Sequence, residues 1–307
     1  MKRMMLILAF AVVVSFAVLA QETVYVSSKG SSGNSGLSEA EPVDFNTALM
    51  HVATKGITKI IILGTLDQNS NGIDKKIGAL FFLNDKVGVD KRGAALEEIV
   101  ITGKPGASGK ERAVLSAKKS GTIPVMIGDS KFRFENIEIS GAEGDESGFG
   151  VYINNNAQVT LGPGVVLRNN ANYGIFVAAG GTCIIDGGEV SNNGGGVLVG
   201  GELFLQNGSI RNNRNSRTGG GGVYIFEGRF TMSDGTITGN RAPAGGGVYI
   251  GEAGLFVISG GSITKNTVSD FGGGVAIEKG GRFEQNGGTI SGNFAMKSIL
   301  SPNISKE

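Results

Sequence analysis

An aliphatic residue, two polar or glycine positions and an asparagine recur as one phrase through the second half of the chain. The six aliphatic/asparagine pairs are Leu167/Asn170, Val190/Asn193, Ile210/Asn213, Ile237/Asn240, Ile263/Asn266 and Ile290/Asn293. Successive pairs lie 20 to 27 residues apart. An internal repeat of this length is typical of a solenoid, in which each unit buries its apolar face only against its neighbours.

Hydrophobic and polar positions alternate before each of these aliphatic residues. The inward positions are predicted to be Cys183, Leu203, Phe230, Phe256 and Phe283 in one column, and Ile185, Leu205, Met232, Ile258 and Gln285 in the next. A period of two predicts a strand with one face inward. A glycine then favours a tight corner before a second short strand. We expect the asparagines to lie at the bend that follows, where their amides can form a ladder between coils.

A third short strand precedes each repeat. It begins at Gly150, Gly174, Gly196, Gly222, Gly247 and Gly274 and has sequences such as Gly-Val-Tyr-Ile. Three strands in a coil of about 25 residues predict an all-β fold, a right-handed parallel β-helix solenoid. An up-and-down barrel would instead need hairpin turns of the Asn-Gly or Asp-Gly type between paired runs.

The N-terminal part is less regular. We expect an opening strand at 23–27, a short capping helix from Asp44 to about Thr54, and strands near 60–63, 79–83, 99–102, 114–116 and 131–139. A solenoid end exposes its core and its strand edges, and the helix would cover them. The predicted organisation is an N-terminal cap at 21–66, irregular coils at 67–144, regular repeats at 145–293 and a tail or cap at 294–307.

Residues 1–20 are predicted to be a secretory signal peptide, because Lys2 and Arg3 precede an uncharged apolar run that ends in small residues. We therefore expect export to the periplasm, the cell surface or the medium, with no transmembrane segment after cleavage. Removing Lys2 and Arg3 from the 28 basic residues leaves 26 against 27 acidic ones, which argues against nucleic acid as a partner. A single cysteine, Cys183, excludes an intrachain disulfide.

Two resemblances follow from these motifs. The Tyr-Val-Ser-Ser opening with its capping helix and apolar strand resembles the pectin-lyase-like β-helix superfamily. The Gly-Gly-Gly-Val-Tyr-Ile runs at 220–225 and 245–250 are similar to the repeats of polymorphic outer-membrane adhesins and autotransporter passengers. The second resemblance covers about residues 145–295. This chain departs from those repeats by having isoleucine, valine or leucine before the asparagine. Together they imply a β-helix fold and an adhesin-like or carbohydrate-active role.

Candidate catalytic chemistry is sparse. Asp186 and Asp234 each precede a corner glycine, where a turn role is favoured over catalysis. The acidic loop 143–146 is a candidate calcium loop, with a solvated loop as the favoured alternative. His51 has no partner at metal-ligand spacing. No catalytic residue, metal ligand or cofactor is predicted.

The outward positions offer better candidates for binding. The third strands present Tyr152, Phe176, Leu198, Tyr224, Tyr249 and Ala276 in one outward column. An exposed column of this kind can bind a glycan or a partner protein, and outward stacking that stabilises the sheet is the alternative. Arginines on the loops after the asparagines are candidates for binding acidic polysaccharide, with ordinary solvated charge as the alternative. The candidate binding residues are Tyr152, Phe176, Tyr224, Tyr249, Arg214, Arg217 and Arg241.

The sequence thus predicts an exported, non-catalytic β-helix that binds a surface glycan or a host or matrix protein in the manner of an adhesin. A polysaccharide lyase or glycoside hydrolase with its site in the stretch 64–144 is one alternative. A structural envelope protein without a ligand is the other.

Overall fold

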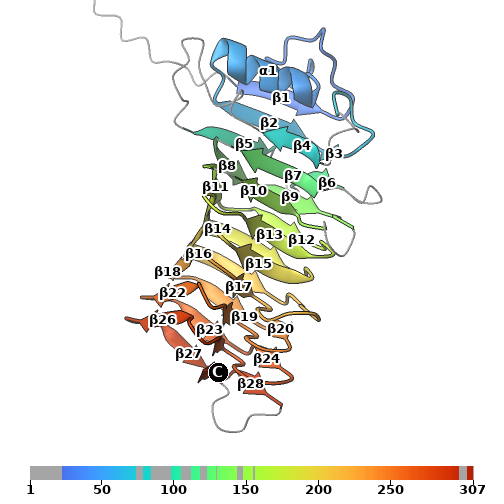
Figure 1. Cartoon of the computed structure of the whole chain (residues 1–307). Helices are drawn as coiled ribbons and strands as arrows, with labels where there is room; N and C mark the ends of the chain where they lie inside the picture. The colour runs from blue at the N-terminus through green and yellow to red at the C-terminus, as the bar shows by residue number, and fades with distance from the viewer. Residues whose placement is uncertain are drawn as a thin grey trace, which may run out of the picture.

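The chain folds into stacked coils of short parallel strands, as the computed structural model shows (Figure 1). The described residues are 23–73, 79–83, 98–104, 112–117, 123–128, 130–143, 148–154, 156–296 and 303–306. Strands make up 49% of the described residues and helix 5%, which confirms the predicted all-β right-handed parallel β-helix. The predicted signal peptide and residues 144–146 of the predicted acidic loop lie outside the described residues.

Each coil contributes up to three main strands. The first strands of the coils are β1 Thr23–Ser27, β2 Lys59–Leu63, β5 Ile99–Gly103, β8 Lys131–Glu135, β11 Gln158–Leu161, β18 Arg229–Met232, β22 Leu255–Ile258 and β26 Arg282–Gln285. The second strands are β3 Thr65–Leu66, β6 Ala113–Ser116, β9 Ile137–Ser140, β12 Val166–Arg168, β19 Thr236–Thr238, β23 Ser262–Thr264 and β27 Thr289–Ser291. Two long strands, β14 Thr182–Ser191 and β16 Glu202–Arg211, occupy both positions. All of these belong to one 17-stranded sheet.

The third strands form a separate 9-stranded sheet. They are β4 Ala79–Leu83, β7 Ile123–Gly128, β10 Val151–Asn154, β13 Tyr173–Val177, β15 Gly195–Val199, β17 Val223–Ile225, β21 Val248–Ile250, β25 Val275–Ile277 and β29 Ile304–Lys306. A small sheet that the sequence did not predict follows the ladder asparagines of the last coils. It consists of β20 Arg241–Ala242, β24 Thr267–Val268 and β28 Phe294–Ala295.

Left-handed backbone at the first corner decides where strands break. The predicted single strand at 131–139 is wrong, because Asn136 has φ of 48° and separates β8 from β9. In β14 the predicted corner is instead a bulge, with register shifts on either side of Asp186 and the left-handed residue at Gly187 rather than Gly188. A left-handed residue lets the chain change direction at low cost, so this column of corners bends every coil alike.

The N-terminal helix confirms the predicted cap. Helix α1, Phe45–Lys55, begins after Asp44, whose carboxylate accepts a hydrogen bond of 2.9 Å from the backbone N–H of Thr47. It ends at Gly56, which has φ of 70°. Its buried residues are Phe45, Ala48, Leu49 and Val52. The helix lies beside β1 at the N-terminal end of the solenoid (Figure 1), where it covers apolar core.

The interior is built from columns of equivalent residues. The rings of Phe230 and Phe256 stack with centroids 4.7 Å apart, and those of Phe256 and Phe283 lie 5.4 Å apart. Cys183 lies in the same inward column and is fully buried, which raises the pKa of its thiol to about 12. This thiol is therefore a packing group in an apolar core.

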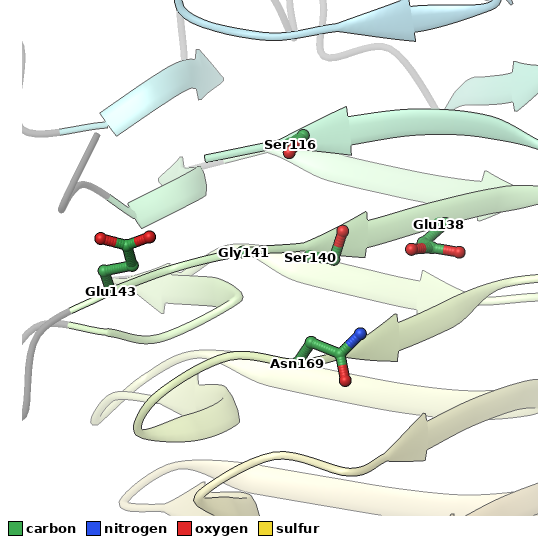
Figure 2. A pocket seen from close by; sticks show the side chains of 6 residues that line it. All are labelled: Ser116, Glu138, Ser140, Gly141, Glu143 and Asn169. Atoms are coloured by element: carbon green, nitrogen blue, oxygen red, sulfur yellow. The ribbon is translucent and has the colours of Figure 1, made fainter. Parts of the chain in front are cut away.

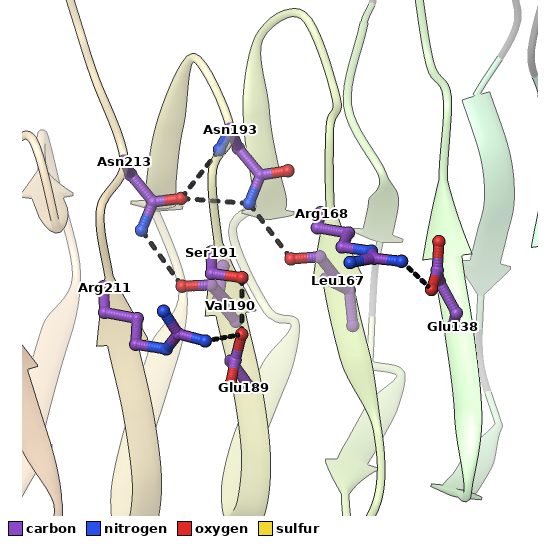
Figure 3. Close-up of polar contacts among 9 residues, drawn as sticks. All are labelled: Glu138, Leu167, Arg168, Glu189, Val190, Ser191, Asn193, Arg211 and Asn213. Atoms are coloured by element: carbon purple, nitrogen blue, oxygen red, sulfur yellow. Dashed lines mark hydrogen bonds and ion pairs between the residues drawn. The ribbon is translucent and has the colours of Figure 1, made fainter. Parts of the chain in front are cut away.

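The repeated asparagines form a continuous buried ladder, and Figure 3 shows two of its members, Asn193 and Asn213. Asn193 donates through Nδ2 to the backbone oxygen of Leu167 at 3.2 Å and to Oδ1 of Asn213 at 3.0 Å. Asn213 repeats this pattern with Val190 and with Asn240. The residues just before the ladder asparagines all have left-handed backbone; they are Asn169, Asn192, Asn212, Gly239, Lys265 and Gly292.

Asn170 is the first rung of this ladder. Its backbone N–H and its Nδ2 both donate to Oδ1 of Asn193, at 3.1 and 2.9 Å. Its own Oδ1 accepts a hydrogen bond of 3.1 Å from the backbone N–H of Ala142 in the preceding coil. The ladder therefore begins where the regular repeats begin, and its first amide is satisfied by backbone of the irregular part.

Asn266 carries the ladder into the last coils. Its Oδ1 accepts from the backbone N–H and Nδ2 of Asn240, at 2.9 and 3.0 Å, and its Nδ2 donates to Oδ1 of Asn293 at 3.0 Å. Oδ1 of Asn303 then accepts hydrogen bonds from the backbone N–H and from Nδ2 of Asn293, both at 3.2 Å. Each buried amide thus uses its oxygen toward one neighbour and its nitrogen toward the other.

The chain ends its described course in the third-strand sheet. The strand β29 follows Asn303 and pairs with β25. Within the described part of the chain, no helix has both the length and the hydropathy needed to cross a membrane.

Candidate functional site

The outward residues of the third strands lie in register, one above the other. Tyr152 pairs with Phe176, Phe176 with Leu198, Leu198 with Tyr224, and Tyr224 with Tyr249. All five are partly exposed. The predicted column does not extend to Ala276, which is fully buried. A Cβ built on Gly272 would lie 2.7 Å from the Ala276 Cβ, so the turn before β25 covers this alanine.

The rings form a longer row than the sequence predicted. Tyr152 meets Phe176 edge to face at 5.0 Å, and Tyr224 meets Tyr249 in the same way at 5.3 Å. Phe226 bridges the gap left by Leu198, because its ring centroid lies 6.1 Å from Phe176 and 6.3 Å from Tyr224. Phe149 extends the row at the end of Tyr152 and Phe176. We call this set the aromatic row: Phe149, Tyr152, Phe176, Phe226, Tyr224 and Tyr249.

Phe149 and Phe226 were missed because they lie just outside the strand alternation. Phe149 precedes β10, and its ring centroid lies 5.2 Å from that of Phe176. Phe226 follows β17 and reaches back over the neighbouring coil because Gly200 leaves space there. A Cβ on Gly200 would come within 2.5 Å of the Phe226 ring. The only sequence signal is a glycine at the matching position of the preceding coil.

The glycine runs before β17 and β21 shape the border of the aromatic row. Gly220 and Gly245 have φ of 75° and 58°, and a Cβ on either would lie within 2.7 Å of the Cβ of Tyr224 or Tyr249, respectively. A Cβ on Gly219 would lie 2.2 Å from the Tyr249 ring. Bare backbone therefore packs against the edge of the row, which explains the Gly-Gly-Gly-Gly-Val sequence in physical terms.

The predicted arginines lie on the loops that lead into these same strands. Arg214 and Arg217 precede β17, and Arg241 precedes β21. All three are exposed. Arg214 pairs with Arg241 in a parallel bridge between consecutive coils. The structure thus places the arginines on consecutive coils, in the segments that lead into the strands of Tyr224 and Tyr249.

The six predicted ladder asparagines lie beside this surface without being part of it. Each is buried, with an exposed fraction of 6% or less; they are Asn170, Asn193, Asn213, Asn240, Asn266 and Asn293. Their amides are occupied by hydrogen bonds between coils. A ligand on the outer surface could not reach these amides, so the ladder holds the loops in place rather than contacting a ligand.

The hydroxyls of Tyr224 and Tyr173 are neutral at physiological pH. Burial, and then the charge of Glu278, raise the pKa of Tyr224 above its ordinary value. Burial also raises the pKa of Tyr173, whose hydroxyl lies beside the loop. Both groups therefore remain hydrogen-bond donors as well as acceptors.

A separate open groove of about 480 Å³ lies at the second strands (Figure 2). It is lined by Ser116, Glu138, Ser140, Gly141, Glu143 and Asn169. The Glu138 carboxylate lies 2.7 Å from the Arg168 guanidinium (Figure 3), and this contact raises the pKa of Arg168. The groove therefore offers one carboxylate already neutralised by an arginine, and a second, Glu143, from the start of the acidic loop.

The remaining candidates have local structural surroundings. Asp234 accepts a hydrogen bond of 2.7 Å from the N–H of Gly235, as expected of a turn residue. Asp186 lies 3.8 Å from Arg133. His51 lies 3.0 Å from Lys55, and desolvation together with this cation lowers its pKa. In the described part of the chain, no group of three or more histidine, cysteine, aspartate or glutamate side chains is placed to hold a metal ion.

Comparison with known proteins supports the fold. Residues 149–301 match the family described as right handed beta helix region. The chain is similar in structure to the pectate lyase Pel9A, with a TM-score of 0.53 and 15% identity over 93% of this chain and 78% of that one. At this identity the likeness concerns the fold alone. No curated protein shows a significant match to the sequence.

Proposed function

We propose that this right-handed parallel β-helix is an exported, non-catalytic binding protein of the adhesin type, which holds a glycan on its aromatic row. The supporting observation is the continuity of the row: six rings lie partly exposed on one face, and Phe226 spans the coil that contributes Leu198 instead of a ring. Aromatic rings provide large apolar area at little cost in conformational entropy, and tyrosine adds a polar group at its edge. The extended solenoid repeats this surface along its length.

The site belongs to a surface rather than to a deep pocket, which suits a polymer or a matrix protein better than a small molecule. A cell-surface, periplasmic or secreted location is part of the proposal. It rests on the predicted signal peptide at residues 1–20.

A glycan array read with the purified chain tests the proposal, with Tyr224→Ala/Tyr249→Ala as the variant. Each truncated aromatic should cost about 2 kcal/mol, so the double variant should lose about 700-fold in affinity. Ile184→Ala/Phe204→Ala is the matched control, because these outward apolar residues lie on the first-strand face. Unchanged glycan binding in the tyrosine variant would refute the aromatic row as the site.

A second candidate function is carbohydrate cleavage at the groove of Glu138 and Glu143. Two carboxylates line that groove, and glycoside hydrolysis uses a carboxylate pair. It predicts release of reducing or unsaturated sugar ends from a polysaccharide, abolished by Glu143→Gln. Binding without any such release, with the Tyr224→Ala/Tyr249→Ala variant inactive in binding, would reject it in favour of the adhesin-type role.

A further inference from the structure

We infer that the loop 213–221, together with Arg241, forms an oxyanion subsite beside the aromatic row, so that the bound glycan carries carboxylate or sulfate groups. This inference rests on the proposed function and specifies the charge of its ligand. The subsite lies between the ladder asparagines and the third strands.

The first observation is that two arginines occupy the same position on consecutive coils. Arg214 and Arg241 are partners in a parallel bridge. Their backbones are fixed, since Arg241 N–H donates to the oxygen of Asn213 and Asn215 N–H donates to the oxygen of Arg241, both at 2.9 Å. Neighbouring strands are about 4.8 Å apart. Both side chains are exposed and can reach one anion or two adjacent ones.

The second observation is a contrast with three other arginines on this solenoid. Each of the three lies within 2.8 Å of a carboxylate, in the pairs Arg133–Glu135, Arg168–Glu138 and Arg211–Glu189. Within the described residues, no carboxylate lies within 4.0 Å of Arg214 or Arg241. Like charges directly opposite each other on neighbouring strands are destabilising. A bound oxyanion would remove that repulsion and accept hydrogen bonds from both guanidinium groups.

The third observation is a small polar cavity of about 90 Å³ at the same loop. Its lining includes Arg214, Asn215, Ser216 and Arg217. This volume is that of roughly three liquid water molecules, which is enough for an oxyanion and not for a sugar ring with its substituents. The sugar ring would therefore remain on the aromatic row while its charged substituent enters the cavity.

The loop is held rigid by a buried side chain. Oδ1 of Asn215 accepts hydrogen bonds from the N–H groups of Arg217 and Thr218, at 3.0 and 3.1 Å. Its Nδ2 donates to the Tyr173 hydroxyl at 2.6 Å and to the Gly219 oxygen at 3.0 Å. Asn215 is only 5% exposed. A loop fixed before binding loses little conformational entropy when it captures a ligand.

The test uses one polymer backbone with different substituents: dextran, carboxymethyl-dextran and dextran sulfate. Affinities for immobilised polymer are measured for the wild type, for Arg214→Gln/Arg241→Gln, and for Arg229→Gln/Arg282→Gln. The control pair is also exposed, removes the same net charge and lies on the first-strand face. We expect the first pair to weaken binding of at least one anionic dextran by about tenfold or more, and the control pair to leave it within about twofold.

Failure of this inference is distinct from failure of the proposed function. The subsite would be overturned if both double-arginine variants lost affinity for the anionic dextrans equally, or if the wild type bound neither anionic dextran. Glycan-array binding that requires Tyr224 and Tyr249 but not the two arginines would also overturn the subsite and leave the proposed function standing. The anionic dextran that the wild type binds with higher affinity identifies the substituent as carboxylate or sulfate.

Discussion

At the scale of single residues, the ladder asparagine and the residue before it have different structural roles at the same bend. The ladder asparagine is buried and connects coils through its amide, whereas the residue before it is exposed and bends the backbone. Asparagine serves both roles, because its short amide hydrogen-bonds locally and tolerates left-handed backbone. The Ile-x-x-Asn phrase therefore specifies only the buried amide, and the preceding position is free to be Asn, Gly or Lys.

Replacing a central ladder residue should be costly. In Asn240→Ala, the N–H and Nδ2 of Asn213 lose their acceptor and the Ile210 oxygen loses a donor. Buried unsatisfied groups cost about 1–3 kcal/mol each, so we expect a loss of at least about 3 kcal/mol. Chemical denaturation measures it, with exposed Asn286→Ala as a neutral control. A loss below about 1 kcal/mol would show that the ladder contributes little.

Lys265 is the exception among the left-handed residues, since it has φ of 57° where other coils use Asn or Gly. Left-handed backbone costs a lysine about 1–2 kcal/mol, and asparagine tolerates it better. Lys265→Asn should therefore stabilise the fold by about 0.5–1 kcal/mol. The reverse change, Asn212→Lys, should destabilise it by a similar amount. Lys265→Gln, which removes only the charge, should give no gain in thermal stability; an equal gain would assign the effect to charge instead.

At the scale of elements, the sequence predicts what repeats and misses what depends on neighbouring coils. The inward columns and the strand order follow from a period of two read in several copies. The bulge at Asp186 and the left-handed Asn136 depend on single backbone angles that no periodicity reveals. Phe226 joins the aromatic row only because Gly200 on the preceding coil leaves it space. Arg168 and Arg211 face carboxylates for the same kind of reason, through partners in neighbouring coils.

Truncating a phenylalanine of the inner column should destabilise the fold less at the C-terminal coil than in the middle of the column. Phe256 is fully buried between two rings, whereas Phe283 lies on the last first-strand and is half-buried. Phe256→Ala should lower the free energy of unfolding by about 3–5 kcal/mol, because it leaves a cavity between the rings of Phe230 and Phe283. Phe283→Ala should cost less than half of that. Urea denaturation of the two variants measures both, and equal losses would mean that the C-terminal coil is covered in solution.

At the scale of the whole molecule, stability is a sum over coils and their interfaces, so it need not be uniform. Helix α1 covers the first coil, and the inward Val24 and Ile60 are fully buried there. In the last described coil, Phe283 and Ile290 are only half-buried. The two ends therefore differ in how well their cores are protected, and opening should begin at the C-terminal coil.

Hydrogen exchange measured by mass spectrometry tests this asymmetry. Backbone amides of residues 282–296 should exchange fastest among the described strands, and those of 156–258 slowest, because the central coils have a partner on both sides. Phe256→Ala should then speed exchange in coils at 229–296 well before those at 131–177, since each coil contacts only its neighbours. A uniform increase along the whole chain would show instead that the solenoid unfolds as one cooperative unit, with the cap and the C-terminal coil coupled across every interface between them.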